Sequence, residues 1–274
     1  MQKNLPAILA LSWIVLLAGA AGSASTASAY DYDPASDYNQ IRKEMVDRHS
    51  QTIPTQWGEA VAGVKRKIRT QEKVIALTLD ACGSATGMNL DQELIDFLER
   101  EQVPATLFIN ARWIERNRPA FDRLAANPLF EIANHGLLHK PASVTGRSAY
   151  GISGTRNVGE LVDEIELSNR QLAELTGKGA RFFRSGTAHY DDVAVKVAGD
   201  LGMEVAGYSI LGDAGATFSR EQVKRAILSA GPGDIILLHM NHPGSGTAAG
   251  IMEAVPQLKK RGYSFVRLSD VELQ

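Results

Sequence analysis

Residues 73–83 read KVIALTLDACG, an apolar run that ends in an acid, a cysteine and a glycine. Further short apolar runs follow it, separated by amphipathic stretches. The apolar runs predict strands at Val74–Leu79, Ala105–Ile109, Phe130–Ala133, Arg181–Phe183, Glu204–Tyr208, Ile235–Leu238 and Ser264–Arg267. The amphipathic stretches predict helices near Leu90–Arg100, Ala120–Ala126, Val158–Leu175, Asp192–Leu201, Arg220–Ser229 and Ala248–Arg261.

Strands and helices thus alternate along this whole region of the chain. Such alternation implies right-handed crossovers and a parallel sheet covered by helices. The number of units favours an α/β fold of the closed or nearly closed barrel type, and an open doubly wound sheet is the structural alternative. No GxGxxG or P-loop follows the first strand, so the sequence gives no support to a nucleotide-binding version of that alternative.

Composition excludes several classes of protein. The chain has 274 residues, of which 44% are hydrophobic, and 29 basic side chains face 31 acidic ones for a net charge of −2. These values are typical of a globular protein with a large core, and they exclude disordered, collagen-like and coiled-coil chains. Nucleic acid is excluded as the main partner because basic residues are not clustered. The single cysteine, Cys82, excludes an intramolecular disulfide.

The first 29 residues have the pattern of a secretory signal peptide. Lys3 precedes the apolar stretch Ala7–Ala18, and small residues then lead to the A-x-A cleavage site Ala27-Ser28-Ala29. An uncleaved membrane anchor is the alternative, but the apolar stretch is short for a span of about 20 residues. Cleavage of residues 1–29 predicts a mature chain without a stable membrane span, exported to the periplasm, the cell envelope or the outside of a bacterium.

The next segment, residues 30–72, is polar and has no strong apolar period, apart from a short helix predicted near Asn39–His49. We interpret it as an N-terminal arm or cap over a catalytic domain at residues 73–274.

Polar side chains follow the predicted strands at their carboxyl ends, where parallel α/β folds gather their functional groups. These residues are Asp80 and Cys82 after the first strand, His135 and His139 after the third, Arg184 after the fourth, Asp213 beyond the fifth and His239 after the sixth. Because the carboxyl ends of parallel strands meet at one edge, we expect these side chains to lie close together.

The pair His135 and His139 is the candidate metal site. An H-x3-H spacing on a turn places both imidazoles on one side, as a first-row transition metal requires of neighbouring ligands. Two unrelated surface histidines are the alternative, but a position beside Asn134, just past a buried strand, favours ligation. A second pair, His239 and His242, lies in a glycine-rich loop and is not expected to bind metal.

Each of the other candidates has a structural alternative. Asp80 either caps the next helix or bears a catalytic carboxylate, and Arg184 either packs in the barrel mouth or keeps that carboxylate ionised. His239 is either a buried core histidine or a general acid. Cys82 is a reactive thiol, a metal ligand or a small buried apolar residue.

The order of these segments resembles the polysaccharide deacetylase family, also called carbohydrate esterase family 4 or the NodB-homology domain, over most of the mature chain. Thr78-Leu79-Asp80 resembles the T-F-D-D first motif, and Asn134–His139 resembles the H-[ST]-x-x-H second motif. Phe183-Arg184 is similar to the start of the R-x-P third motif, and Leu237-Leu238-His239 to the L-x-H fifth. Asp213 lies where the fourth motif is expected.

The resemblance implies a distorted (β/α)7 barrel that hydrolyses N-acetyl groups on an acetylated amino-sugar polysaccharide. Peptidoglycan, a chitin-like polymer and an exopolysaccharide are the candidate substrates. It also implies a divalent transition metal, with zinc as the first choice, held by His135 and His139.

The same resemblance implies a role for each remaining residue. Asp80 would act as general base on the attacking water, with Arg184 holding its charge and orientation. His239 would protonate the leaving amine, tuned by Asp213.

The sequence departs from the family pattern in three motifs, of which the fourth, Tyr208–Asp213, is too diverged for the register to fix its acid. Ala81 occupies the position of the aspartate that ligates the metal, and alanine cannot ligate. Three alternatives remain open: Asp80 turns to the metal, water fills the vacancy, or Cys82 contributes a thiolate that Zn²⁺ accepts. The third motif, Arg184–Tyr190, lacks the Pro and Tyr of the family, so the resemblance assigns no oxyanion donor. The sequence therefore predicts an atypical branch.

The leading hypothesis is an exported, metal-dependent deacetylase. A catalytically impaired glycan-binding or scaffolding protein of the same fold is the alternative, in which Ala81 marks a lost activity. An exported amidase for a small non-carbohydrate amide is a third. The presence of Asp80, Arg184 and His239 favours an enzyme, because a binding module has no need for a base, its ion-pair partner and an acid at one barrel mouth.

Overall fold

The computed structural model describes residues 36–83 and 89–274. The strands that form its central sheet are β2 (Val74–Ala81), β3 (Ala105–Ile109), β4 (Phe130–Asn134), β5 (Phe182–Phe183), β7 (Glu204–Val205), β8 (Ile210–Leu211), β9 (Ile235–His239) and β10 (Ser264–Phe265). Their order is β7-β5-β4-β3-β2-β9-β8, with β10 beside β2, and every pair is parallel. The predicted α/β fold, a distorted (β/α)7 barrel, is confirmed. The predicted signal peptide lies outside the described residues.

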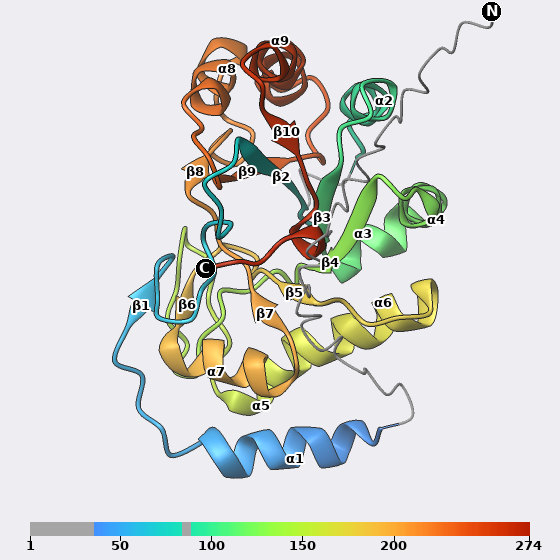
Figure 1. Cartoon of the computed structure of the whole chain (residues 1–274). Helices are drawn as coiled ribbons and strands as arrows, with labels where there is room; N and C mark the ends of the chain where they lie inside the picture. The colour runs from blue at the N-terminus through green and yellow to red at the C-terminus, as the bar shows by residue number, and fades with distance from the viewer. Residues whose placement is uncertain (1–35, 84–88) are drawn as a thin grey trace, which may run out of the picture.

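Helices surround the curled sheet (Figure 1). They are α2 (Gln92–Arg100), α3 (Ala111–Arg116), α4 (Arg118–Ala126), α5 (Val158–Val162), α6 (Ser168–Thr176), α7 (Asp192–Asp200), α8 (Arg220–Leu228) and α9 (Gly246–Lys260). A π-helical segment, Asp163–Leu167, joins α5 to α6, and a 3-10 turn covers Leu268–Asp270. Several of these helices begin where the sequence offers a cap: the Asp91 carboxylate accepts a hydrogen bond from the Leu94 amide at the start of α2.

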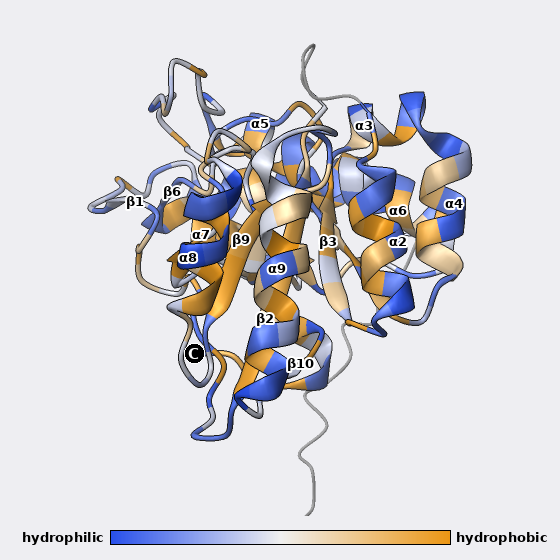
Figure 2. Ribbon diagram, turned by 90° about the horizontal axis from the view of Figure 1, so that it is seen from above, coloured by the Kyte–Doolittle hydropathy of each residue, from blue (hydrophilic) through white to orange (hydrophobic). Residues whose placement is uncertain are grey.

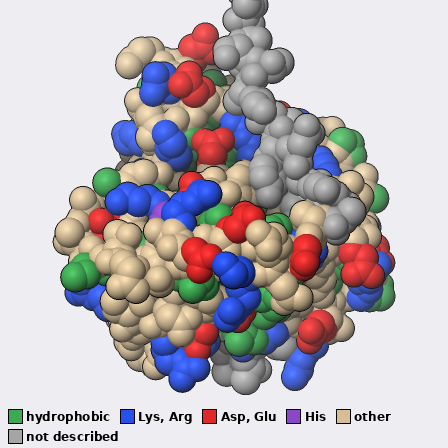
Figure 3. All heavy atoms as spheres, turned by 90° about the horizontal axis from the view of Figure 1, so that it is seen from below, with side chains coloured by type: hydrophobic (Ala, Val, Ile, Leu, Met, Phe, Trp, Pro, Cys, Tyr) green, Lys and Arg blue, Asp and Glu red, His purple; other side chains and the backbone are tan. Residues whose placement is uncertain are grey.

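The two faces of the sheet pack into different parts of the core. Along β2, Leu79 and Ala81 point outward into the apolar layer under the helices, whereas Ala76 points into the barrel. Because side chains alternate along a strand, Thr78 and Asp80 share the inner face with Ala76. Figure 2 shows the consequence as apolar strands inside helices whose outer faces are hydrophilic. Acidic and basic side chains intermingle on the face seen in Figure 3.

Part of the segment before residue 73 is built into this barrel. Its helix α1 (Tyr38–His49) packs against α5 and α7, and its strand β1 (Trp57–Gly58) pairs antiparallel with β6 (Tyr190–Asp191). Further along, Lys65 pairs with Ala206 and Lys67 with Asp234. This stretch therefore lies between the β7 end of the sheet and the residues that lead into β9.

The structure differs from the expectations at a few elements. The strand predicted over Glu204–Tyr208 ends at Val205, because Ala206 and Gly207 approach Lys65 instead. Strand β8 and helix α3 were not predicted. At two and six residues they are too short to show a hydrophobic period. No helix among the described residues is both long and apolar enough to cross a membrane.

Candidate active site

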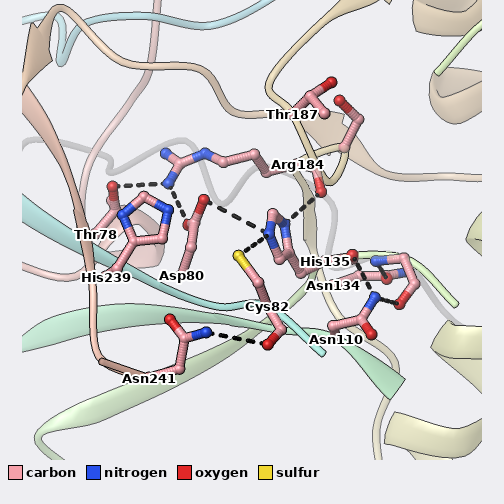
Figure 4. Close-up of polar contacts among 12 residues, drawn as sticks. Thr78, Asp80, Cys82, Asn110, Asn134, His135, Arg184, Thr187, His239 and Asn241 are labelled. Carbon is pink, nitrogen blue, oxygen red and sulfur yellow. Dashed lines mark hydrogen bonds and ion pairs between the residues drawn. The ribbon is translucent and has the colours of Figure 1, made fainter. Parts of the chain in front are cut away.

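The carboxyl ends of neighbouring parallel strands bring the predicted residues together. In the register of β2 and β9, Asp80 lies directly beside His239. Asn134, the last residue of β4, pairs with Phe183 of β5, which places the next residue, Arg184, in the barrel mouth. Figure 4 shows Asp80, Arg184 and His239 converging there. Sequence-distant residues thus meet because parallel strands end at one edge.

Asp80 and Arg184 form a buried ion pair. Arg184 is fully buried, and its Nη1 donates to Asp80 Oδ1 at 2.8 Å and to Thr78 Oγ1 at 2.9 Å. Its Nε and Nη2 donate to the carbonyls of Ala206 and Gly207, and the guanidinium stacks on the Phe108 ring. These contacts fix one oxygen of the Asp80 carboxylate and leave the other, Oδ2, facing the site.

His239 and Asp213 form a second buried pair. His239 Nδ1 lies 2.8 Å from Asp213 Oδ1, and Asp213 Oδ2 accepts from the His239 amide at 2.7 Å and from Thr247 Oγ1 at 2.9 Å. Burial favours the neutral imidazole, but the Asp213 carboxylate outweighs burial and raises the pKa of His239 well above 6.5. In the same way, burial alone would raise the pKa of Asp213, but the charge of His239 outweighs burial and lowers that pKa. A protonated His239 at neutral pH follows.

A third group has the chemistry of a metal site. One ligand atom each of Cys82, His135 and His139 lies within 4.8 Å of the others, and the Cys82 sulfur is 3.6 Å from His135 Nε2. His135 Nδ1 lies 2.9 Å from the Arg184 carbonyl, to which it can only donate, so Nε2 keeps a free lone pair. The buried Nε2 of His139 has no hydrogen-bond partner among the described residues.

This donor set fits a zinc ion. A thiolate and two imidazoles are ligands that Zn²⁺ accepts in a tetrahedral site with an open position. Burial favours the neutral thiol of Cys82, but its electrostatic interaction with His139 and hydrogen bonds with the neighbouring histidines outweigh burial and lower the thiol pKa well below its ordinary range. Asp80 is not part of the group, although its Oδ2 lies 3.7 Å from His135 Nε2.

Buried polar residues hold the loop that carries both histidines. Glu164, in the π-helical segment, accepts hydrogen bonds from the amides of Leu138 and Lys140 on either side of His139. Asn110 Nδ2 donates to the His135 carbonyl at 3.1 Å. His139 itself has a φ of 62°, a strained value for a residue with a Cβ. The loop conformation is therefore enforced by its surroundings.

These groups open onto a pocket of about 760 Å³. Asp80, Cys82, His139 and His239 line it, and Thr187 contributes a hydroxyl that is buried without a hydrogen-bond partner among the described residues. The candidate base Asp80, the candidate acid His239 and two members of the metal-binding group therefore face one cavity.

The family model for polysaccharide deacetylases matches residues 67–206, just over half of the chain. The chain belongs to the polysaccharide deacetylase family. A peptidoglycan-N-acetylglucosamine deacetylase from Bacillus cereus is 26% identical over 217 residues, which cover 78% of this chain and 94% of that protein. A bifunctional xylanase/deacetylase from Pseudobutyrivibrio xylanivorans is 25% identical over 73% of this chain, which spans only 30% of that longer protein.

A solved structure with the same fold is that of a carbohydrate esterase family 4 pseudoenzyme from Bacillus anthracis. It has a TM-score of 0.62 and 22% identity, with coverage of 75% of this chain and 67% of that one. That protein shares the fold of this polysaccharide deacetylase.

The first atypical position is Ala81. Its side chain is buried in the outer apolar layer, away from the pocket, whereas Cys82 turns its sulfur toward His135. Asn241 Nδ2 holds this turn by donating to the Cys82 carbonyl at 3.0 Å. Of the three alternatives that the sequence leaves open, the geometry favours Cys82 as the third ligand.

The second atypical feature is the diverged third motif, Arg184–Tyr190. Thr187 stands three residues after Arg184, and Gly186 packs so closely against His139 that a Cβ there would overlap the histidine. Glycine is therefore required beside the metal-binding loop. Thr187 lines the pocket, and its hydroxyl is buried without a hydrogen-bond partner among the described residues.

Sequence reasoning missed several residues that shape this site. Glu164 lies within a predicted amphipathic helix, where nothing distinguishes a buried glutamate from a solvated one. Glu59 and Tyr150 also line the pocket, but they come from the N-terminal arm and from a loop 91 residues later, joined by a hydrogen bond that no local pattern reveals.

Proposed function

We propose that this protein is an exported, metal-dependent hydrolase that removes N-acetyl groups from an amino-sugar polymer of the bacterial envelope. The observation that carries the proposal is one pocket lined by Asp80, Cys82, His139 and His239. Behind this lining, Arg184 pairs with Asp80, Asp213 pairs with His239, and His135 completes the group of Cys82 and His139. Amide hydrolysis needs a base, an acid and an electrophile within reach of one carbonyl, and these are the groups present.

Cys82, His135 and His139 would hold the metal, for which zinc is the best match to a sulfur and two nitrogen ligands. The bound ion supplies a Lewis acid for the amide carbonyl and lowers the pKa of water. The Arg184 carbonyl orients His135 for this role by accepting from its Nδ1.

Asp80 acts as the general base. Arg184 holds Oδ1, so the free Oδ2 takes a proton from the water that attacks the acetyl carbon. The Thr187 hydroxyl donates to the carbonyl oxygen as negative charge develops on it. Arg184 positions Asp80 and touches no reacting atom.

His239 acts as the general acid. Because Asp213 keeps its imidazole protonated, His239 can give a proton to the amine nitrogen as the C–N bond breaks. The water oxygen ends on the acetyl carbon, so the products are a free amino sugar and acetic acid, which loses its proton to solvent as acetate. Asp80 releases its proton to solvent and His239 takes one up, which restores both groups.

The relatives and the sequence support an envelope substrate. Curated relatives from Bacillus cereus and Bacillus subtilis are named as deacetylases of peptidoglycan N-acetylglucosamine and N-acetylmuramic acid. The signal-like first 29 residues supply the expected route to such a polymer. Peptidoglycan is thus our first choice, ahead of a chitin-like polymer or an exopolysaccharide.

The alternative is a glycan-binding protein that has lost catalysis. Ala81 favours it, since the usual ligand position is empty of any donor atom. Under this alternative the protein binds glycan without zinc and releases no acetate.

Acetate release from acetylated peptidoglycan and chitin oligomers by the zinc-loaded protein tests the proposal. Replacing His135, His139 or His239 by Ala is expected to abolish release, because each substitution removes a ligand or the acid. His49→Gln is the matched control, since His49 pairs with Asp200 at the α1–α7 contact, away from the pocket. Full activity in the three pocket variants would overturn the proposal.

A further inference from the structure

The N-terminal arm carries one residue, Glu59, to the rim of the active-site pocket. Strand β1 pairs with β6, so that Trp57 faces Asp191 and Gly58 faces Tyr190 (Figure 1). The Asp192 carboxylate fixes the preceding turn by accepting from the amides of Thr55 and Gln56. The chain then delivers Glu59, the residue after β1, to the pocket wall. The arm thus builds part of the wall.

Glu59 is held there by two tyrosines. Its Oε2 accepts from the Tyr208 hydroxyl at 2.7 Å and its Oε1 from the Tyr150 hydroxyl at 3.1 Å. His189 Nδ1 is 3.9 Å from Oε1, and about a third of the Glu59 side chain, 32%, remains exposed. The carboxylate is therefore fixed in position and still has acceptor capacity toward the pocket.

The rim beside Glu59 is apolar and exposed. Tyr150 is 77% exposed, although its ring and hydroxyl are placed by Glu59 and His189. Ile152 and Leu211, which are also among the exposed large apolar side chains of the described chain, line the same pocket. Tyr150 has a φ of 52°, a conformation that persists only where the surroundings enforce it. An exposed, preorganised aromatic ring at a pocket rim suits the apolar face of a sugar.

A second hollow continues on the other side of Glu59. It has a volume of about 620 Å³, and Glu59, Trp57 and His189 contribute to its lining. The His189 ring lies 5.9 Å from the Trp57 ring and 5.2 Å from the Tyr150 ring, measured between centroids. A row of rings thus leads from the active-site pocket to the second hollow, where the Arg147 guanidinium lies 5.1 Å from the centroid of the Trp57 ring.

On this wall the Glu59 carboxylate faces the active-site pocket, whereas Arg66 contributes to the lining of the second hollow. Neither lysine nor arginine is among the described residues that line the active-site pocket. Within 4.0 Å of Glu59, His189 is the one basic side chain found in the described part of the chain. A carboxylate without a fixed countercharge attracts hydroxyl and ammonium donors and repels anions.

We propose that Glu59 and Tyr150 form a saccharide subsite that takes a neutral or cationic hexosamine next to the reacting sugar and disfavours a sugar bearing a carboxylate. Tyr150 stacks on the ring, and Glu59 accepts from its hydroxyl or ammonium group. This subsite rests on the proposed function, and it deepens it by predicting where the polymer runs and which neighbours it tolerates. Glu59 precedes residue 67, where the family match begins, so the arm contributes the carboxylate of the subsite and the matched region contributes Tyr150.

Binding of two unreactive tetramers to the zinc-loaded protein tests the subsite. A β-1,4-linked glucosamine tetramer carries ammonium groups at pH 6, and a β-1,4-linked mannuronate tetramer carries carboxylates. Neither has an N-acetyl group, so titration calorimetry reads affinity without turnover. We expect the glucosamine tetramer to bind at least about tenfold more tightly, and Glu59→Gln to reduce that ratio by about fivefold.

Two further variants separate the contributions. Tyr150→Ala is expected to weaken both tetramers by about fivefold, because it removes the stacking ring and leaves the charge. Glu72→Gln, an exposed carboxylate outside both hollows, is the matched control and should change neither affinity. An affinity ratio that Glu59→Gln leaves unchanged would overturn the charge selection, and affinities indifferent to Tyr150→Ala would overturn the stacking.

The experiments distinguish failure of the subsite from failure of the catalytic proposal. If the wild-type protein releases no acetate but its tetramer affinities respond to Glu59→Gln as expected, the deacetylase assignment fails and the subsite stands. If acetate is released and the affinities do not respond, the subsite fails alone.

Discussion

Replacing Asp213 by Asn tests the role of His239 as general acid. Asparagine keeps the shape of Asp213 and can still accept from the His239 amide and Thr247, so the variant removes charge more than structure. Nδ1 of His239 and Oδ1 of Asp213 are 2.8 Å apart in a buried site. For charge centres about 4 Å apart and an effective dielectric constant of about 20, the lost attraction is about 4 kcal/mol. Relaxation reduces this, and we expect the pKa of His239 to fall by about 1–3 units.

The sign of the effect on activity follows from the raised pKa of His239. A general acid works while it is protonated, so the rate is lost as pH rises through that pKa. Lowering the pKa must move the high-pH limb of kcat/KM for acetate release down by the same about 1–3 units. Burial alone lowers the pKa of a histidine. At neutral pH the His239 imidazole of the variant should therefore be largely uncharged, and acetate release should be slow.

The assay is acetate release between pH 5 and 10 by zinc-loaded wild type and variant, with matched zinc content. Thr247→Val is the control, because it removes one hydrogen bond from Asp213 and leaves the charge in place. The reasoning is refuted if Asp213→Asn lowers the rate equally at every pH, or if its high-pH limb stays where the wild type has it.

Four further predictions concern the metal site, the Asp80–Arg184 pair and the Thr187 hydroxyl. Cys82→Ser should weaken zinc binding about 100- to 1,000-fold, which is the contribution of one ligand to the affinity of a typical zinc site. It should also abolish the sulfur-to-metal charge-transfer band of the cobalt-substituted protein, whereas Cys82→Asp should retain metal binding without that band. Arg184→Ala should lower the free energy of unfolding in urea by about 3–5 kcal/mol, because it leaves the buried Asp80 carboxylate without its ion-pair partner. A loss below about 1 kcal/mol would contradict a stabilising ion pair between Asp80 and Arg184. Glu164→Gln should reduce zinc affinity about tenfold with the fold intact by circular dichroism, since it loosens the loop around His139; unchanged affinity would remove that role. Thr187→Val should lower kcat about 10- to 100-fold with little change in KM, and an effect confined to KM would assign Thr187 to substrate binding instead.

The fold could be predicted because its pattern is long and repeated. Apolar runs such as Val74–Leu79 and Ile235–Leu238 are buried strands, and they match β2 and β9 to within two residues. Strand β8 was not predicted because two residues cannot show a hydrophobic period. Strand β1 was not predicted because its partner, β6, lies over 130 residues away in the sequence. Short elements held by distant partners have no local signature.

The site could be predicted in composition but not in detail. Strand ends identify Asp80, Arg184 and His239 because parallel topology gathers them. Whether Cys82 serves as a ligand depends on which way the chain turns after β2, and only the burial of Ala81 in the outer layer settles the direction of the two side chains. Glu59 reaches the pocket through tertiary contacts alone.

The most direct test of the account is the zinc content of the purified protein, prepared without chelators and without nickel affinity columns. An activity assay alone leaves a negative result ambiguous between an inactive protein and a wrong substrate. We predict close to one zinc per chain in the wild type, lost in the Cys82→Ser variant. Absence of metal from the wild type, even after incubation with excess zinc, would contradict the assignment and favour the glycan-binding alternative.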